Sequence, residues 1–217
     1  MDQFISAAAV EDCALKISCD TMEYSPITLP ENAAIVVADT KLPRTLAGSA
    51  YNQRRAECDE ALELIKSNLS DRFNIETMAD INVEVVDASQ QFLPPTLFQR
   101  VRHVATENLR VEDAAKALAA GDLETLGKLF DASHASLRDD YEVSSEGLDR
   151  VTSLMRDKEG CFGARLTGAG FGGCAIALVD ASIVDQFVNE LNDSCELTPK
   201  PEFFWSKSVA GGLVFEA

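Results

Sequence analysis

The chain has 217 residues, of which 46% are apolar and 25% are charged, and its formal net charge at pH 7 is −17. This length and composition suit one large globular domain, or two small ones, with a real hydrophobic core. The acidic balance argues against nucleic acids and anionic membranes as partners, because both are bound through lysine and arginine.

The cysteines and the N-terminus indicate the compartment. Six cysteines occur without C-x-x-C spacing, and neither of the two histidines lies near paired cysteines, so we expect reduced thiols and no metal site. The first residues lack the basic and apolar regions of a signal peptide. No apolar run approaches the ~20 residues of a membrane helix. We therefore expect a cytoplasmic protein.

The first 40 residues predict a short helix followed by strands. Residues 1–9 are compatible with a helix. Residues 13–19 alternate between apolar and polar types, which is typical of a half-buried strand. Residues 23–29 suit a partner strand in which Pro26 indicates an edge or a bulge. Residues 33–38 form an unbroken apolar run, as in a central strand.

The middle of the chain predicts helices, because apolar residues recur there at helical spacing. The three stripes are Cys58, Ala61, Leu62, Ile65 and Leu69; Leu97, Val101, Val104, Val111, Ala115 and Leu118; and Leu123, Leu126, Phe130, Ser133 and Leu137. Asn108 falls within the second stripe and should need a buried hydrogen-bond partner. His103 lies one position off that stripe, so we expect it at the surface or at the core boundary.

The third helix ends in residues 138–141, a charge cluster that we interpret as an ion-paired helix end. A fourth helix is expected to begin after Ser144 or Ser145 and to end near Gly160. Further along, Ser182 should cap a helix, and residues 203–207 suit a last strand with Trp205 packed at an edge.

Four glycines lie within six residues near the C-terminal end, between two apolar runs of strand length. They are Gly168, Gly170, Gly172 and Gly173. Three of them fit the G-x-G-x-x-G spacing of dinucleotide sites, but that motif requires a helix after the glycines, and an apolar run of strand length follows here. The Walker loop is excluded because no Gly-Lys-Ser/Thr follows. A structural turn and a loop that supports a phosphate site both remain open.

Four stretches together resemble one family. Residues 166–174 are similar to the third conserved motif of the GHMP small-molecule kinases, in the form found in galactokinases. Residues 1–4, 51–58 and 133–144 resemble galactokinases as well, and all four stretches occur in the family's order. The resemblance covers nearly the whole chain, and the four motifs together are specific.

The resemblance implies roles for three sites. Asp2 matches the aspartate beside the C1 hydroxyl of the sugar, as general base or orienting group; by itself it is also a residue suited to a helix N-terminus. Tyr51 matches a tyrosine of the sugar pocket, although tyrosine is also common at a core margin. Thr167 and the four glycines match the motif that packs beneath the nucleotide-binding loop. Residues 138–141 also lie in a matching stretch, but their position suggests that they support the glycine loop and the domain junction rather than take part in chemistry.

The resemblance also implies a partial active site. The complete enzyme would use ATP and Mg²⁺ to phosphorylate D-galactose, drawing on an N-terminal sugar motif and a glycine-rich phosphate loop that this sequence does not contain. We therefore expect the chain alone to be inactive or nearly so, to hold no cofactor tightly, and to pair with an N-terminal kinase half. Alternatives are a kinase for a related sugar such as N-acetylgalactosamine, a non-catalytic galactose sensor, and a domain without a ligand.

The implied fold is α+β: a mostly antiparallel sheet packed with helices in a ferredoxin-like arrangement, as in the C-terminal domain of the GHMP kinases. Residues 1–30 are expected to be the end of an N-terminal kinase domain and residues 31–217 the C-terminal domain. An apolar face left for the other half should promote association, so we expect a homodimer or a tendency to aggregate.

Overall fold

The computed structural model describes residues 2–42 and 47–212, without the side chains of residues 2, 47 and 49. Its helices are α1 (Asp2–Ala8), α2 (Ala47–Leu69), α3 (Val83–Ser89), α4 (Pro95–Ala120), α5 (Leu123–Asp139), α6 (Glu146–Arg156) and α7 (Val184–Ser194), with 3-10 helices η1 (Met78–Asp80) and η2 (Ala181–Ile183). Its strands are β1 (Cys13–Ile17), β2 (Tyr24–Thr28), β3 (Ala33–Asp39), β4 (Cys161–Leu166), β5 (Cys174–Asp180) and β6 (Glu202–Trp205).

The main sheet has four strands in the order β4-β5-β3-β6, and each neighbouring pair is antiparallel. Helices connect β3 to β4, a glycine-rich loop connects β4 to β5, and α7 connects β5 to β6. This order and these crossovers give the ferredoxin-like arrangement, and the expected α+β class is confirmed. The unbroken apolar run at residues 33–38 does form a central strand, because β3 lies between β5 and β6.

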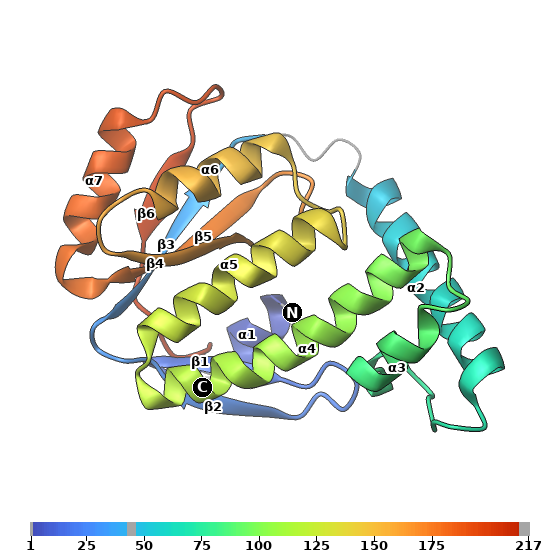
Figure 1. Cartoon of the computed structure of the whole chain (residues 1–217). Coiled ribbons are helices and arrows are strands. Elements are labelled where there is room, and N and C mark those ends of the chain that lie inside the picture. The colour runs from blue at the N-terminus through green and yellow to red at the C-terminus, as the bar shows by residue number, and fades with distance from the viewer. Residues whose placement is uncertain (1, 43–46, 213–217) are drawn as a thin grey trace, which may run out of the picture.

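One face of the sheet forms the core. Alternate residues of β3 (Ala34, Val36 and Ala38) are buried, whereas the residues between them are only partly so. The buried face packs against α6 and α7, whose inward residues include Leu148, Met155 and Phe187. Figure 1 shows α5 and α6 lying across the sheet and α7 beside β6.

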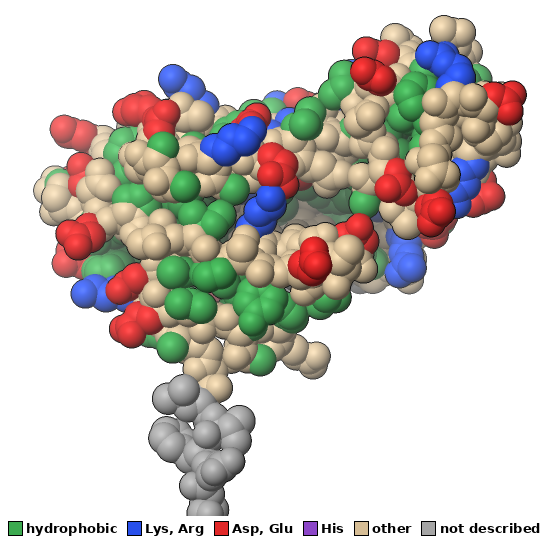
Figure 2. All heavy atoms as spheres, turned by 90° about the horizontal axis from the view of Figure 1, so that it is seen from below, with side chains coloured by type: hydrophobic (Ala, Val, Ile, Leu, Met, Phe, Trp, Pro, Cys, Tyr) green, Lys and Arg blue, Asp and Glu red, His purple; other side chains and the backbone are tan. Residues whose placement is uncertain are grey.

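The helices α2, α3 and α4 form a second apolar cluster beside the sheet. It contains the predicted α2 residues Ala61, Ile65 and Leu69, together with Val85 of α3 and Val101 of α4. The short helix α3 was not predicted. Figure 2 shows the molecule from below, with a hollow between a broad body and a narrower lobe. Acidic side chains are spread over this face.

The N-terminal segment forms a two-stranded sheet that packs against α4 and the start of α5. Among the residues that the structure describes, β1 and β2 pair only with each other, so Pro26 lies in an edge strand, as predicted. Helix α1 rests on this hairpin, where the rings of Phe4 and Tyr24 meet edge to face with centroids 5.2 Å apart. The backbone N–H of Gly211 donates to the carbonyl of Ala9 over 2.7 Å, so the C-terminal segment returns to α1.

Several predictions about single residues are wrong. His103 is buried rather than near the surface, because α4 is covered by α2 on one side and α5 on another, which widens its buried face. Asn108 is exposed and needs no buried partner. Ser182 does not cap α7: the Asp180 side chain accepts the N–H of Ser182 at the start of η2. Ser145 does cap α6, as expected, and that helix ends at Arg156, before Gly160.

Within residues 2–42 and 47–212, no helix is both long enough and apolar enough to cross a membrane.

Candidate functional site

The glycine loop, residues 167–173, joins β4 to β5 as a tight and irregular turn. The backbone N–H of Thr167 donates to the carbonyl of Cys174 over 3.0 Å and closes its base. Gly168, Gly170 and Gly173 have φ of 76°, 79° and 80°, and Gly172 has φ of 129°. Residues with side chains rarely adopt such angles, so the glycines are required by the path of the backbone. The strand after the loop confirms that it is no dinucleotide fingerprint.

The connection between α5 and α6 supports one side of the loop. The backbone N–H of Phe171 donates to the carbonyl of Val143 over 2.7 Å. At Gly170, an added Cβ would lie 2.1 Å from the same carbonyl oxygen. The two chain segments can approach this closely only because position 170 has no side chain.

The end of β3 supports the other side of the loop. Thr40 follows β3, is 2% exposed, and donates twice to the carbonyl of Gly173, from its backbone N–H over 3.0 Å and from Oγ1 over 2.6 Å. Both lone pairs of that carbonyl are therefore used. The glycine loop is thus tied at Phe171 and at Gly173 to segments distant in sequence.

A buried arginine fixes the connection that carries Val143. Arg100 of α4 is 1% exposed, and its Nε donates to Glu57 of α2 over 2.6 Å. Its Nη1 donates to the carbonyl of Asp140 over 2.5 Å. Its Nη2 donates to the carboxylate of Glu142, also over 2.5 Å. Arg54 also donates to Glu57, over 2.6 Å. Burial would raise the pKa of Glu57, but hydrogen bonds from Arg100 and Arg54 hold it below its usual value. We call Arg54, Glu57, Arg100 and Glu142 the arginine cluster.

Aromatic and thiol groups pack beside the arginine cluster. The ring of His103 stacks on Tyr141 with centroids 4.5 Å apart, and its Nδ1 lies 2.9 Å from the buried hydroxyl of Ser136. Cys58 of α2 lies 3.8 Å from the Tyr141 hydroxyl. Burial raises the pKa of Tyr141 and lowers that of His103 to about 4, so both groups are uncharged at neutral pH.

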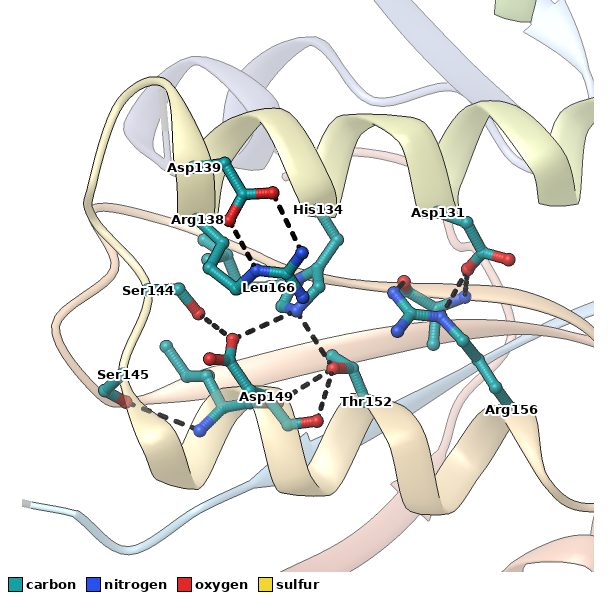
Figure 3. Close-up of polar contacts among 12 residues, drawn as sticks. Asp131, His134, Arg138, Asp139, Ser144, Ser145, Asp149, Thr152, Arg156 and Leu166 are labelled. Carbon is teal, nitrogen blue, oxygen red and sulfur yellow. Dashed lines mark hydrogen bonds and ion pairs between the residues drawn. The ribbon is translucent and has the colours of Figure 1, made fainter.

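A second set of polar side chains holds β4, the strand that leads into the glycine loop (Figure 3). Asp131 of α5 accepts the backbone N–H of Ala164 over 2.9 Å, and Nδ1 of His134 accepts that of Leu166 over 3.2 Å. Arg156 of α6 donates from Nε to Asp131 over 2.5 Å and from Nη2 to the carbonyl of Ala164. We call Asp131, His134 and Arg156 the edge clamp.

The edge clamp bonds the backbone groups of β4 that a further strand of the sheet would otherwise bond. Because β4 is at the end of the sheet, no strand of residues 2–42 or 47–212 bonds the alternate backbone groups on its outer side. Helix α5 can come close enough to bond them because Gly127 and Gly163 meet there: a Cβ on Gly163 would lie 2.1 Å from the Gly127 carbonyl oxygen. The outer edge of β4 is therefore covered by side chains rather than open to solvent.

The described residues near the loop do not form a complete nucleotide site. The cavity beside Thr40 is about 160 Å³, which is below the roughly 300–1,000 Å³ usual for a small-molecule site. Its charged lining residues, Glu146 and Arg150, form an ion pair with each other over 2.5 Å. Among the residues that the structure describes, no three His, Cys, Asp or Glu side chains are grouped so as to hold a metal ion.

The structure brings some of the predicted site residues together and leaves others apart. Thr167 and the four glycines form one loop, as expected. Tyr51 lies near the start of α2 and is 52% exposed; the same helix carries Glu57 and Cys58, which contact the support of the loop. Asp2 is the first residue of α1, and its side chain lies outside the described part of the structure.

The sequence prediction missed the residues that hold the loop in place. Thr40 lies outside the four stretches that resemble galactokinases. Val143 lies inside one of them, but it acts through its backbone carbonyl, which every residue has. A signal was available for the edge clamp: Asp131 and His134 are polar, lie three residues apart on an amphipathic helix, and adjoin the apolar stripe at Phe130 and Leu137. The expected ion-paired end of α5 is confirmed, since Arg138 pairs with Asp139 over 2.7 Å.

Comparison with known proteins gives the relatives of this chain. Residues 114–197 match the family model described as GHMP kinases C terminal. The chain is 44% identical to the galactokinase of Roseiflexus sp. (strain RS-1) over 191 residues, covering 88% of this chain and 48% of that protein. It is 38% identical to the galactokinase of Streptococcus thermophilus, with coverage of 100% and 56%. The chain thus spans about half the length of the curated relatives it matches.

The structure is similar to that of a solved galactokinase. The crystal structure of Lactococcus lactis galactokinase complexed with galactose matches with a TM-score of 0.86 and 36% sequence identity, over 96% of this chain and 54% of that one. The expected resemblance to the galactokinase form of the GHMP kinases is therefore confirmed in both sequence and fold.

Proposed function

This chain carries a GHMP kinase C-terminal domain of the galactokinase type, and from this premise we propose that it forms one side of a sugar-kinase active site. The complete enzyme would transfer the γ-phosphoryl group of MgATP to the C1 hydroxyl of D-galactose. The observation that carries the proposal is the glycine loop, which is tied to Thr40 and Val143 and lies in a chain similar to galactokinases over nearly its whole length.

We assign three roles within that site. Asp2 would orient or deprotonate the C1 hydroxyl, Tyr51 would form part of the wall of the sugar pocket, and the glycine loop would support the loop that holds the nucleotide. The half-exposed ring of Tyr51 supports its role, since a sugar ligand could reach it. ATP and magnesium would be held mainly by the other half of the enzyme; the cavity of about 160 Å³ beside Thr40 is small for a nucleotide.

The arrangement of the N-terminal segment supports a division of the chain. Strands β1 and β2 form a sheet separate from the four-stranded one. We propose that residues 1–30 are the end of an N-terminal kinase domain, that residues 31–217 are the C-terminal domain, and that the enzyme works in the cytoplasm. The N-terminal kinase half would then be the natural partner of this chain.

The direct test is a chimera in which this chain replaces the matching portion of Lactococcus lactis galactokinase. We expect galactose-dependent ADP release by the chimera and little or none by the purified chain alone. Asp2→Asn in the chimera should reduce kcat by about 10²-fold or more, the usual contribution of a general base. Tyr51→Phe is the milder variant and should alter KM for galactose more than kcat.

Other outcomes would point elsewhere. Turnover by the chain alone would show that it has a phosphate site of its own and would contradict the proposed division of labour. A folded chimera that binds galactose but releases no ADP would favour the galactose-sensor alternative. A preference for N-acetylgalactosamine would keep the kinase chemistry and change the substrate.

Association is the remaining part of the proposal. Large apolar side chains are exposed on the N-terminal hairpin and on β6, among them Met22, Tyr24 and Phe204 at 45–51%. Such side chains favour contact with another protein surface. We propose that the isolated chain forms homodimers or larger species, and a monomer that is independent of concentration in analytical ultracentrifugation would contradict this.

A further inference from the structure

The edge clamp contains a buried histidine whose protonation state is fixed by its neighbours. His134 is 1% exposed and lies between α5, α6 and β4 (Figure 3). Its Nδ1 lies 3.2 Å from the backbone nitrogen of Leu166. A backbone N–H can only donate, so Nδ1 must be the acceptor and cannot carry a proton.

The other ring nitrogen has two acceptors. Nε2 lies 3.1 Å from Oγ1 of Thr152 and 3.2 Å from Oδ1 of Asp149. The Thr152 hydroxyl donates to the carbonyl of Leu148 over 3.0 Å, so it is free to accept from the ring. Asp149 also accepts the hydroxyl of Ser144 over 2.5 Å, which orients the carboxylate. The proton of the imidazole therefore resides on Nε2.

The hydrogen bond from Leu166 to His134 lies where β4 ends and the glycine loop begins. Leu166 is the last residue of β4, and Gly168, the first glycine of the loop, is two residues further on. The next backbone N–H, that of Thr167, points to the opposite side and bonds the carbonyl of Cys174. Strand β4 is thus fixed between β5 and the histidine at the point where the irregular backbone begins.

We propose that His134 is a positioning residue, acting as a neutral Nε2–H imidazole whose bare Nδ1 holds the exit of β4 and thereby sets where the glycine loop begins. Its relevance to phosphoryl transfer rests on the function proposed above, but its action on the loop does not. Protonation of Nδ1 would set two donors against each other and release Leu166.

Charged side chains around the ring of His134 shift its pKa in opposite directions. Arg156 on α6 and Arg138 on α5 disfavour the imidazolium, and Asp149 on α6 favours it. Asp139 on α5 also interacts electrostatically with the ring. Burial is the largest influence and lowers the pKa of His134 to about 4. The ring is therefore neutral at physiological pH, as the hydrogen bond to Leu166 requires.

The test combines a spectroscopic measurement with two matched variants of the full chain. In ¹⁵N-labelled protein at pH 7, the imidazole spectrum of His134 should show the Nε2–H tautomer. His134→Asn keeps an acceptor near the position of Nδ1 that does not titrate, whereas His134→Leu has a similar size and no acceptor. We expect His134→Leu to speed amide exchange at Leu166 and through residues 167–173 by roughly tenfold or more, and His134→Asn to restore most of the protection.

The pH dependence separates positioning from general stability. In the wild-type chain the loop resonances should shift on acidification with a midpoint near the pKa of His134, about 4, and in His134→Asn this transition should disappear. Amides of α2, far from the clamp, serve as the internal reference.

Three results would overturn the proposal: an Nδ1–H tautomer or an imidazolium at pH 7, unchanged exchange in a folded His134→Leu, or equal exchange in the Asn and Leu variants. If His134→Leu does not fold, the wild-type tautomer and the Asn variant still decide the matter. None of these readouts requires kinase activity, so an inactive chimera would contradict the proposed function and leave the role of His134 standing.

Discussion

Two of the supports of the glycine loop, the arginine cluster and the edge clamp, differ in chemistry. The arginine cluster holds the Val143 side through full charges, with Arg100 bonded to Glu57 and Glu142. The edge clamp holds the β4 side partly through a neutral ring, because His134 must accept a backbone N–H. The arginine cluster should lose stability when one of its charged residues is replaced. The hydrogen bond from Leu166 to His134 should be lost in acid, when the imidazole is protonated.

The largest effect is expected from breaking the arginine cluster. Arg100→Met leaves Glu57 without its main partner in a largely buried position, and removing one member of a buried ion pair usually costs about 3–5 kcal/mol. We expect the free energy of unfolding in urea to fall by at least ~3 kcal/mol. The matched control is Arg102→Met on the same helix: Arg102 is 46% exposed and pairs with Asp140, so its loss should cost about 1 kcal/mol or less. Equal losses would contradict the importance of the cluster.

Adding a side chain at position 170, where the glycine loop contacts Val143, should have the next largest effect on stability. Gly170→Ala combines a φ of 79° with a Cβ placed 2.1 Å from the Val143 carbonyl oxygen. Strained backbone of this kind costs about 1–3 kcal/mol, and the contact must also be relieved, so we expect a loss of about 2–3 kcal/mol in urea unfolding. Gly48→Ala is the control, because nothing lies within 4 Å of its Cβ in α2; it should gain up to about 1 kcal/mol.

Acid should lower the free energy of unfolding by protonating the buried histidines. Burial lowers the pKa of both His103 and His134 from 6.5 to about 4. Between pH 4 and pH 6.5 the unfolded chain therefore binds more protons than the folded chain. The free energy of unfolding keeps its full value above pH 6.5 and decreases as the pH falls toward 4. For each histidine the loss at pH 5 should be about 2 kcal/mol. Urea unfolding at several pH values would measure it, and a His134→Asn chain that retains the wild-type slope would speak against His134 as the source.

The smallest effect is expected at Thr40. Thr40→Val keeps the shape and the backbone N–H bond to Gly173 but removes the hydroxyl donor, so a loss of about 1 kcal/mol is expected. Thr40→Ser keeps the donor and should lie closer to wild type. If the serine variant proved as unstable as the valine variant, then packing of the methyl group, rather than the hydrogen bond, would be what Thr40 provides.

Much of the fold could be predicted because local patterns matched the final burial. The apolar run at residues 33–38 became a central strand, and the stripe at Cys58, Ala61, Ile65 and Leu69 became the buried face of α2. The prediction for His103 was wrong because helical spacing cannot tell how many neighbours will cover a helix. Val111, which the same spacing placed in the core, is 44% exposed.

The sequence by itself determined most of the helices and strands and the position of the glycine loop, because periodicity and glycine content are local properties of the chain. The α+β class followed from the resemblance to the GHMP kinases. Only the tertiary structure decided what holds that loop. The hydrogen bonds from Thr40 to Gly173, from Phe171 to Val143 and from Leu166 to His134 join residues 28–133 positions apart. A backbone carbonyl or N–H is present at nearly every position, so which of them become supports depends on the three-dimensional packing of distant segments.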